Sequence, residues 1–166
     1  FYGDSIIPKV NFEEINNIIA IQSLSKTAGL AGLRMGFAFG NKDLIKYINK
    51  VTGPYDINSF AVKATMAALN DKKYIDDYVF EVKKAREWIK NKFASLNSRS
   101  NFNGGNYFLI WPNKEPKLLV QEMKKNGILI RNMENKKDIE NSLRVSIGTR
   151  KQMQFFWEKF IQLEVI

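Results

Sequence analysis

One lysine in the first quarter of the chain lies in surroundings that suit a reactive amine. Lys26 follows a short apolar run, has hydroxyl side chains nearby at Ser23 and Ser25, and precedes Arg34 by eight positions. A lysine that is partly desolvated or beside other cations loses its proton more easily, which is how lysines that form Schiff bases are activated. The guanidinium of Arg34 is a rigid forked donor for a phosphate. The alternative interpretation is an ordinary solvated lysine in a surface loop.

A second candidate for anion binding lies near the end of the chain. Arg144 falls within the apolar stretch 143–147, and Leu143, Val145 and Ile147 occupy the positions of opposite parity. Side chains alternate between the two faces of a strand. We therefore expect the guanidinium of Arg144 to project alone from the face opposite these apolar side chains.

The residue types that are missing exclude several kinds of site within this chain. Its 166 residues contain no cysteine and no histidine, so disulfides, thiolate or imidazole metal sites, and cysteine or histidine catalysis are ruled out. A formal charge of +9 would suit a nucleic acid, an anionic membrane or a phosphorylated small molecule. The lysine doublets are dispersed, however, and no apolar run approaches the roughly 20 residues of a membrane span. We expect a small-molecule partner, and neither a nucleic acid nor a membrane.

Two strands should position Lys26 and Arg34. The continuous apolar run Ile18–Ile21 predicts a strand over residues 17–22 that is buried on both faces, as in a parallel sheet. A second strand is expected over residues 33–40, with Arg34 on the face that lacks large side chains. Small residues over 27–32 connect the two strands and allow close backbone approach.

The other elements follow from apolar periodicity and from breakers. Helices are expected over residues 42–51, 58–69, 72–96, 116–125 and 150–163, and strands over 106–111, 128–131 and 143–147. The helix over 72–96 would be about 36 Å long, which is typical of a helix that bridges two lobes. Phe156, Trp157 and Phe160 are expected to belong to the core. The pattern predicts an α/β fold that ends in a small α+β lobe.

The segment from Ser23 to Gly36 closely resembles a known signature. It reads SLSKTAGLAGLRMG and is similar to the Ser-x-Ser-Lys…Gly-Leu-x-Gly-x-Arg-x-Gly motif of the class I and II, fold type I, pyridoxal-phosphate aminotransferases. Within that superfamily the segments 53–59, 127–131 and 143–149 are most similar to the histidinol-phosphate aminotransferases. The resemblance implies transfer of an amino group between histidinol phosphate and the pair 2-oxoglutarate and glutamate, in histidine biosynthesis.

The resemblance also implies roles in cofactor binding. Lys26 would form the Schiff base with pyridoxal 5′-phosphate and later move the proton at the substrate α-carbon. Ser23 and Arg34 correspond to family positions that bind the cofactor phosphate, and Ser25 is a further candidate. Tyr2 is the candidate for a tyrosine that faces the ring oxygen of the cofactor.

Two arginines would bind the substrate according to the same resemblance. Arg144 corresponds to the arginine that holds the substrate carboxylate and, in the histidinol-phosphate enzymes, the substrate phosphate. Arg131 corresponds to a second arginine that assists with the phosphate. A pair of forked donors suits a doubly charged anion. For Arg131, an ion pair that only stabilises the fold is the alternative.

The resemblance extends over the chain but covers only the later half of a family member. It implies that residues 1–71 end the large three-layer cofactor-binding domain, that 72–96 form an interdomain helix, and that 97–166 form the small C-terminal α+β domain. The family aspartate that pairs with the pyridine nitrogen has no counterpart here. We therefore expect a C-terminal fragment that is inactive alone, from an enzyme that is a cytoplasmic homodimer at full length.

Other functions remain open at this point. A threonine-phosphate decarboxylase would share the lysine, the arginines and a phosphorylated substrate, and would differ only in the bond broken at the α-carbon. An aminotransferase for aromatic amino acids is a further possibility. Outside this class, the charge of +9 allows a non-catalytic basic module that binds nucleic acid or an acidic partner.

Overall fold

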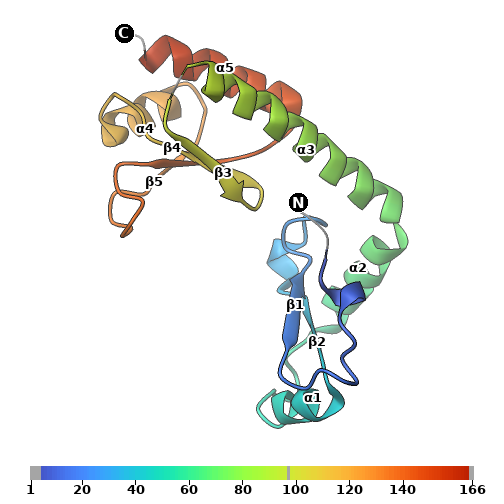
Figure 1. The fold of residues 1–166 in the computed structure, drawn as a ribbon. Coiled ribbons are helices and arrows are strands. Elements are labelled where there is room, and N and C mark those ends of the chain that lie inside the picture. Colours follow the sequence, from blue (N-terminus) through green and yellow to red (C-terminus); the bar gives the residue numbers. More distant parts are fainter. Residues whose placement is uncertain (1–4, 97, 165–166) are drawn as a thin grey trace. The chain divides into compact units, whose positions relative to one another are not determined.

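The computed structural model describes residues 5–96 and 98–164, which form two compact units, one ending at Tyr78 and one beginning at Val79 (Figure 1). Tyr2, one of the predicted cofactor residues, lies outside the described residues. No helix in the described part combines the length and the apolar composition needed to cross a membrane.

The first unit is built on a two-stranded antiparallel ribbon. β1 (Ile19–Ser23) pairs with β2 (Gly36–Gly40), from Ile19 opposite Gly40 to Ser23 opposite Gly36. The helices α1 (Lys42–Asn49) and α2 (Ser59–Asn70) follow, and each begins after an asparagine. The side-chain oxygens of Asn41 and Asn58 accept hydrogen bonds from the first-turn amides of these helices. Both helices therefore start where their capping residues predict.

Two expectations for this unit are wrong. The apolar run over residues 18–21 predicts a strand of a parallel sheet that is buried on both faces. β1 instead runs antiparallel to β2, and Ile21 is 81% exposed. No third strand of the described residues joins this ribbon. The second expected strand would include Leu33 and Arg34, but Ala31–Leu33 form a 3₁₀ turn and Arg34 has φ of 55°, so β2 begins only at Gly36.

The second unit is a four-stranded antiparallel sheet packed against helices (Figure 1). The strands are β3 (Ser100–Gly104), β4 (Tyr107–Ile110), β5 (Arg131–Asn132) and β6 (Leu143–Ser146), in the order β3-β4-β6-β5. The helices are α4 (Pro116–Lys125), α5 (Arg150–Glu164) and the part of α3 (Lys72–Ser95) that follows Tyr78. The helix predictions are confirmed to within two residues at each end. Strand β3 is not predicted, and the strand expected over 128–131 pairs only from Arg131.

Aromatic rings form the core of the second unit. Phe93 of α3 has no exposed surface, and its ring centroid lies 5.6 Å from that of Phe108 in β4 and 5.2 Å from that of Phe160 in α5. Phe156 of α5 contacts Phe108 edge to face at 5.9 Å. The predicted core role of Phe156 and Phe160 is confirmed, because both are buried. This cluster fixes one face of the sheet against α3 and α5.

Replacing Phe93 with alanine should strongly destabilise this unit. The Phe93→Ala change leaves a cavity among the rings and should lower the free energy of unfolding by about 3–5 kcal/mol. Phe80→Ala is the matched control, since Phe80 lies on the same helix with 58% of its surface exposed, and it should cost less than about 1 kcal/mol. Urea unfolding can be followed by the fluorescence of the three tryptophans, all of which lie after Val79. Equal losses in both variants would contradict this description of the core.

Candidate functional site

The predicted lysine lies in a loop that closes at one end of the β1–β2 ribbon. Ser23 ends β1 opposite Gly36, the first residue of β2, so residues 24–35 leave and re-enter the ribbon at the same end. Leu24 and Met35, the first and last residues of this loop, are both buried. The backbone N–H of Leu30 donates to the carbonyl of Leu24 at 3.2 Å. These anchors hold the intervening residues together as one compact loop.

The two serines and the lysine lie where β1 passes into this loop, Ser23 as the last residue of the strand and Ser25 and Lys26 in the first turn. The Ser23 hydroxyl donates to the Ser25 hydroxyl at 2.8 Å, and the Ser23 oxygen accepts from the Ser25 backbone N–H at 3.1 Å. Lys26 is exposed, and its carbonyl accepts from the N–H of Gly29, whose φ is +68°. A left-handed residue favours glycine, which explains the glycine at this turn. Two hydroxyls and one amine thus follow one another where the strand ends and the turn begins.

Arg34 lies near the other end of the loop, one residue before Met35. Its backbone is left-handed, an uncommon conformation for a residue with a side chain, and it ends the 3₁₀ turn Ala31–Leu33. The guanidinium Nη1 donates to the carbonyl of Ala31 at 3.2 Å. The left-handed turn, rather than strand alternation, therefore sets the direction of this side chain. Ser23, Ser25, Lys26 and Arg34 all belong to the end of the ribbon where the loop closes.

The two predicted substrate arginines are neighbours on the sheet of the second unit. Arg131 of β5 lies directly opposite Arg144 of β6 in the antiparallel register. A cavity of about 340 Å³ adjoins them and is lined by Leu129, Ile130, Arg131, Arg144 and Ser146. No carboxylate lines it, and no acidic side chain of the described residues pairs with either arginine. The cavity therefore offers two guanidinium groups to an anion.

One contact in this cluster is not predicted from the sequence. The guanidinium carbon of Arg144 lies 4.1 Å from the centroid of the Tyr107 ring. The expected strand over 106–111 includes Tyr107, but only the register of β4 against β6 brings its ring to Arg144. The sequence gives no signal for this face, because residues 107–110 are all apolar or aromatic and do not alternate in polarity.

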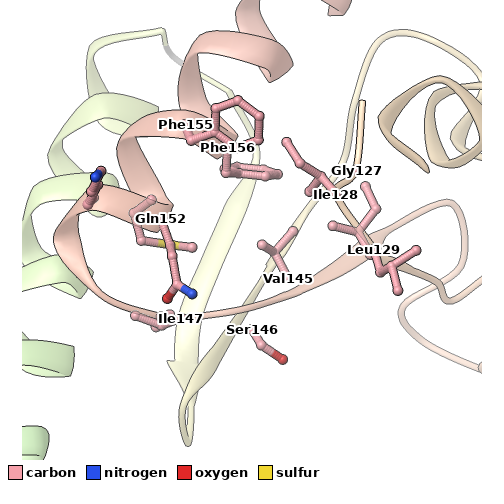
Figure 2. Close-up of a pocket in the computed structure, with 13 residues that line it drawn as sticks. Gly127, Ile128, Leu129, Val145, Ser146, Ile147, Gln152, Phe155 and Phe156 are labelled. Atoms are coloured by element: carbon pink, nitrogen blue, oxygen red, sulfur yellow. The ribbon is translucent and has the colours of Figure 1, made fainter. Parts of the chain in front are cut away.

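A second cavity, about 570 Å³ in volume, lies beside these arginines but includes neither of them. It is bounded by residues 127–130, by β6 and by the first turns of α5, and Figure 2 shows Ile128, Val145 and Phe156 pointing toward one another across it. Lys151 is its one charged lining residue. Because apolar side chains dominate its walls, this cavity offers little chemistry, and the smaller one is the candidate anion site.

The predicted residues thus form two groups in two units. Ser23, Ser25, Lys26 and Arg34 lie in the first unit, and Arg131 and Arg144 lie in the second. Each group is brought together by local strand pairing, at the closed end of the β1–β2 ribbon and in the β5–β6 register.

Comparisons with known proteins give consistent matches. Residues 1–160 match the aminotransferase class I and II family. A histidinol-phosphate aminotransferase from Clostridium beijerinckii is 36% identical over 96% of this chain and 45% of its own length. The structure of histidinol-phosphate aminotransferase from Sinorhizobium meliloti, in complex with pyridoxal-5′-phosphate, has a TM-score of 0.74 at 22% identity, covering 90% of this chain and 43% of that one. The structure of L-threonine-O-3-phosphate decarboxylase from Porphyromonas gingivalis has a TM-score of 0.73 at 20% identity, covering 92% of this chain and 48% of that one.

The matches cover this chain almost completely but cover only part of each relative. The chain spans about half the length of the curated relatives it matches, as the resemblance in the sequence predicts. The structural likenesses confirm the predicted fold class, α/β with the architecture of the fold type I enzymes.

The left-handed turn at Gly29 should be sensitive to substitution. Nothing lies within 4 Å of a Cβ added at Gly29, so Gly29→Ala should cost about 1 kcal/mol through its backbone alone. That corresponds to about fivefold faster amide exchange in the β1–β2 ribbon by hydrogen–deuterium exchange. Gly32→Ala is the matched control, because it also meets no atom within 4 Å and its φ is not positive. Similar exchange rates in both variants would show that the left-handed backbone is not what the glycine provides.

Proposed function

Because the chain belongs to the class I and II aminotransferase family, we propose that it supplies the cofactor-binding lysine and the substrate-binding arginines of a pyridoxal-phosphate-dependent aminotransferase. The observation that carries this proposal is the closed end of the β1–β2 ribbon, where the last residue of β1, Ser23, and the loop over residues 24–35 together supply an exposed lysine, two serine hydroxyls and a guanidinium. This donor set fits the cofactor, since the lysine amine suits its aldehyde and the other groups suit its phosphate.

Each residue has a distinct task in this proposal. The Ser23 and Ser25 hydroxyls and the Arg34 guanidinium hold the cofactor phosphate, and Tyr2 is the candidate for the ring oxygen. The Lys26 amine would hold the cofactor and, when free, would take and return the proton at the substrate α-carbon. When bound, pyridoxal phosphate acts as an electron sink for the carbanion at that carbon. Arg131 and Arg144 orient the substrate through its phosphate or carboxylate.

We propose histidinol phosphate as the amino donor and 2-oxoglutarate as the acceptor. The support is the curated relative at 36% identity, together with two guanidinium groups that face one cavity without a carboxylate. We also propose the domain division at residues 71 and 96, a homodimer, a place in histidine biosynthesis and a cytoplasmic location. These proposals concern the enzyme at full length, of which this chain matches about half.

A second candidate reaction is decarboxylation of threonine phosphate. The likeness to the Porphyromonas gingivalis decarboxylase favours it, with a TM-score of 0.73 over 92% of this chain. Both substrates carry a phosphate that two arginines would bind, so the cavity accommodates either. The reactions differ in whether the amino group or carbon dioxide leaves the α-carbon.

Covalent labelling tests the assignment of Lys26. Incubation of the chain with pyridoxal phosphate, reduction with borohydride and peptide mapping should place the label on Lys26, and Lys26→Ala should abolish it. Lys42→Ala is the control, because Lys42 is an exposed lysine of the same unit at the start of α1, and its labelling pattern should match the unmodified chain. A label spread evenly over the exposed lysines, or retained in Lys26→Ala, would overturn the assignment.

Product analysis separates the two reactions. The protein encoded by the full gene should convert histidinol phosphate and 2-oxoglutarate to glutamate and should release no carbon dioxide from threonine phosphate. Arg144→Gln should raise KM for histidinol phosphate by about 10- to 100-fold, since a charge-assisted pair contributes roughly 1.5–3 kcal/mol. Carbon dioxide release without glutamate formation would favour the decarboxylase instead.

A further inference from the structure

The two residues directly opposite Arg144 in the sheet offer no attractive contact to its guanidinium. In the sheet it lies opposite Leu109 of β4 on one side and opposite Arg131 of β5 on the other. Leu109 is only 8% exposed, so its side chain offers an apolar surface. Like charges directly opposite each other on neighbouring strands repel. Without a further contact, the guanidinium of Arg144 would gain by turning away from Arg131 into solvent.

Tyr107 provides such a contact. It lies two residues before Leu109 in β4, so both side chains are on the same face of the sheet as Arg144. The guanidinium carbon lies 4.1 Å from the ring centroid, within the range of a cation–π interaction. This attraction draws the guanidinium toward β4 and away from Arg131.

The contact leaves the hydrogen-bonding capacity of Arg144 unused. A ring face attracts a cation through its quadrupole and does not need to accept an N–H hydrogen bond. Within residues 5–96 and 98–164, no oxygen accepts a hydrogen bond from Arg144. The donors of its planar fork therefore remain available for a ligand in the adjoining cavity.

Tyr107 is itself held by the turn that precedes it. In the β3–β4 hairpin Tyr107 pairs with Gly104, and residues 105–106 form the turn between them. Arg86, a buried residue of α3, donates from Nη2 to the carbonyl of Gly105. On the other side, the N–H of Ile147 donates to the carbonyl of Asn106 at 2.7 Å. The turn is thus tied both to α3 and to the end of β6.

We propose that Tyr107 is a positioning residue that holds the guanidinium of Arg144 apart from that of Arg131, ready to bind an anion. Tyr107 acts through Arg144 and does not touch the anion itself. The inference rests on the proposed role of Arg144 in anion binding, but the position of the guanidinium can be measured without any ligand.

A spectroscopic measurement on the complete 166-residue chain tests the contact directly. The ring current of Tyr107 should move the side-chain NMR signals of Arg144 upfield. Tyr107→Phe keeps a ring and should retain this shift, whereas Tyr107→Leu should lose it. Tyr47→Leu is the matched control, since Tyr47 lies on α1 in the other unit with Lys50 4.7 Å from its ring centroid, and it should leave the Arg144 signals unchanged.

Titration with inorganic phosphate at fixed low ionic strength tests the consequence for binding. Tyr107→Leu should weaken binding about 2- to 10-fold, and Tyr107→Phe should bind as the unmodified chain does. In an Arg144→Gln background, Tyr107→Leu should cause no further loss, because the residue through which it acts is gone. A residue that merely supports the fold would weaken binding equally in both backgrounds.

The outcomes distinguish failure of the positioning role of Tyr107 from failure of the proposed anion site. An Arg144 signal that is the same in Tyr107→Leu and in the unmodified chain overturns the positioning role, as does a Tyr107→Phe variant that loses as much affinity as Tyr107→Leu. If the unmodified chain binds no phosphate, or Arg144→Gln binds it equally well, the anion site of the proposed function fails. The NMR comparison then still decides whether Tyr107 holds the guanidinium.

Discussion

Burial of Phe108 and Val145 against the aromatic core determines which way the other side chains of β4 and β6 point. The two residues are partners in the antiparallel register, and both face the rings contributed by α3 and α5. Because a strand alternates its side chains, Tyr107 and Arg144 must then lie on the opposite face. The arrangement of the candidate anion site is therefore a consequence of apolar packing on the other side of the same sheet.

In the first unit, the loop over residues 24–35, which contains Lys26, does not depend on a packed core in this way. Few of its residues are buried, and its shape comes from strand pairing at Ser23 and Gly36 and from two left-handed residues, Gly29 and Arg34. In this loop the backbone conformation positions the polar side chains, whereas in the second unit side-chain packing does so. A loop of this kind can present several polar groups at once because it does not have to bury them.

Local signals in the sequence predict the helices well. Helix α4 begins at Pro116 and ends before Asn126, as these residue types indicate, and α3 follows the apolar spacing over 24 residues. Strand pairing is harder to predict, because the residues of a strand do not specify which other strand it pairs with. The orientation of β1 and the contact between Tyr107 and Arg144 depend on register, and the left-handed conformation of Arg34 comes from a turn that strand alternation does not predict. The motif around Lys26 identified the family, but the geometry of its loop required the structure.

Arg34 illustrates a conflict between stability and activity at a single position. The left-handed conformation costs a residue with a Cβ about 1–2 kcal/mol, a cost that glycine does not have. Selection for a stable loop alone would therefore favour glycine where the chain has an arginine with φ of 55°. A glycine would avoid this cost but would remove the guanidinium that the proposed phosphate site needs. The strained backbone at Arg34 is thus compatible with the phosphate-binding role that we propose for its charge.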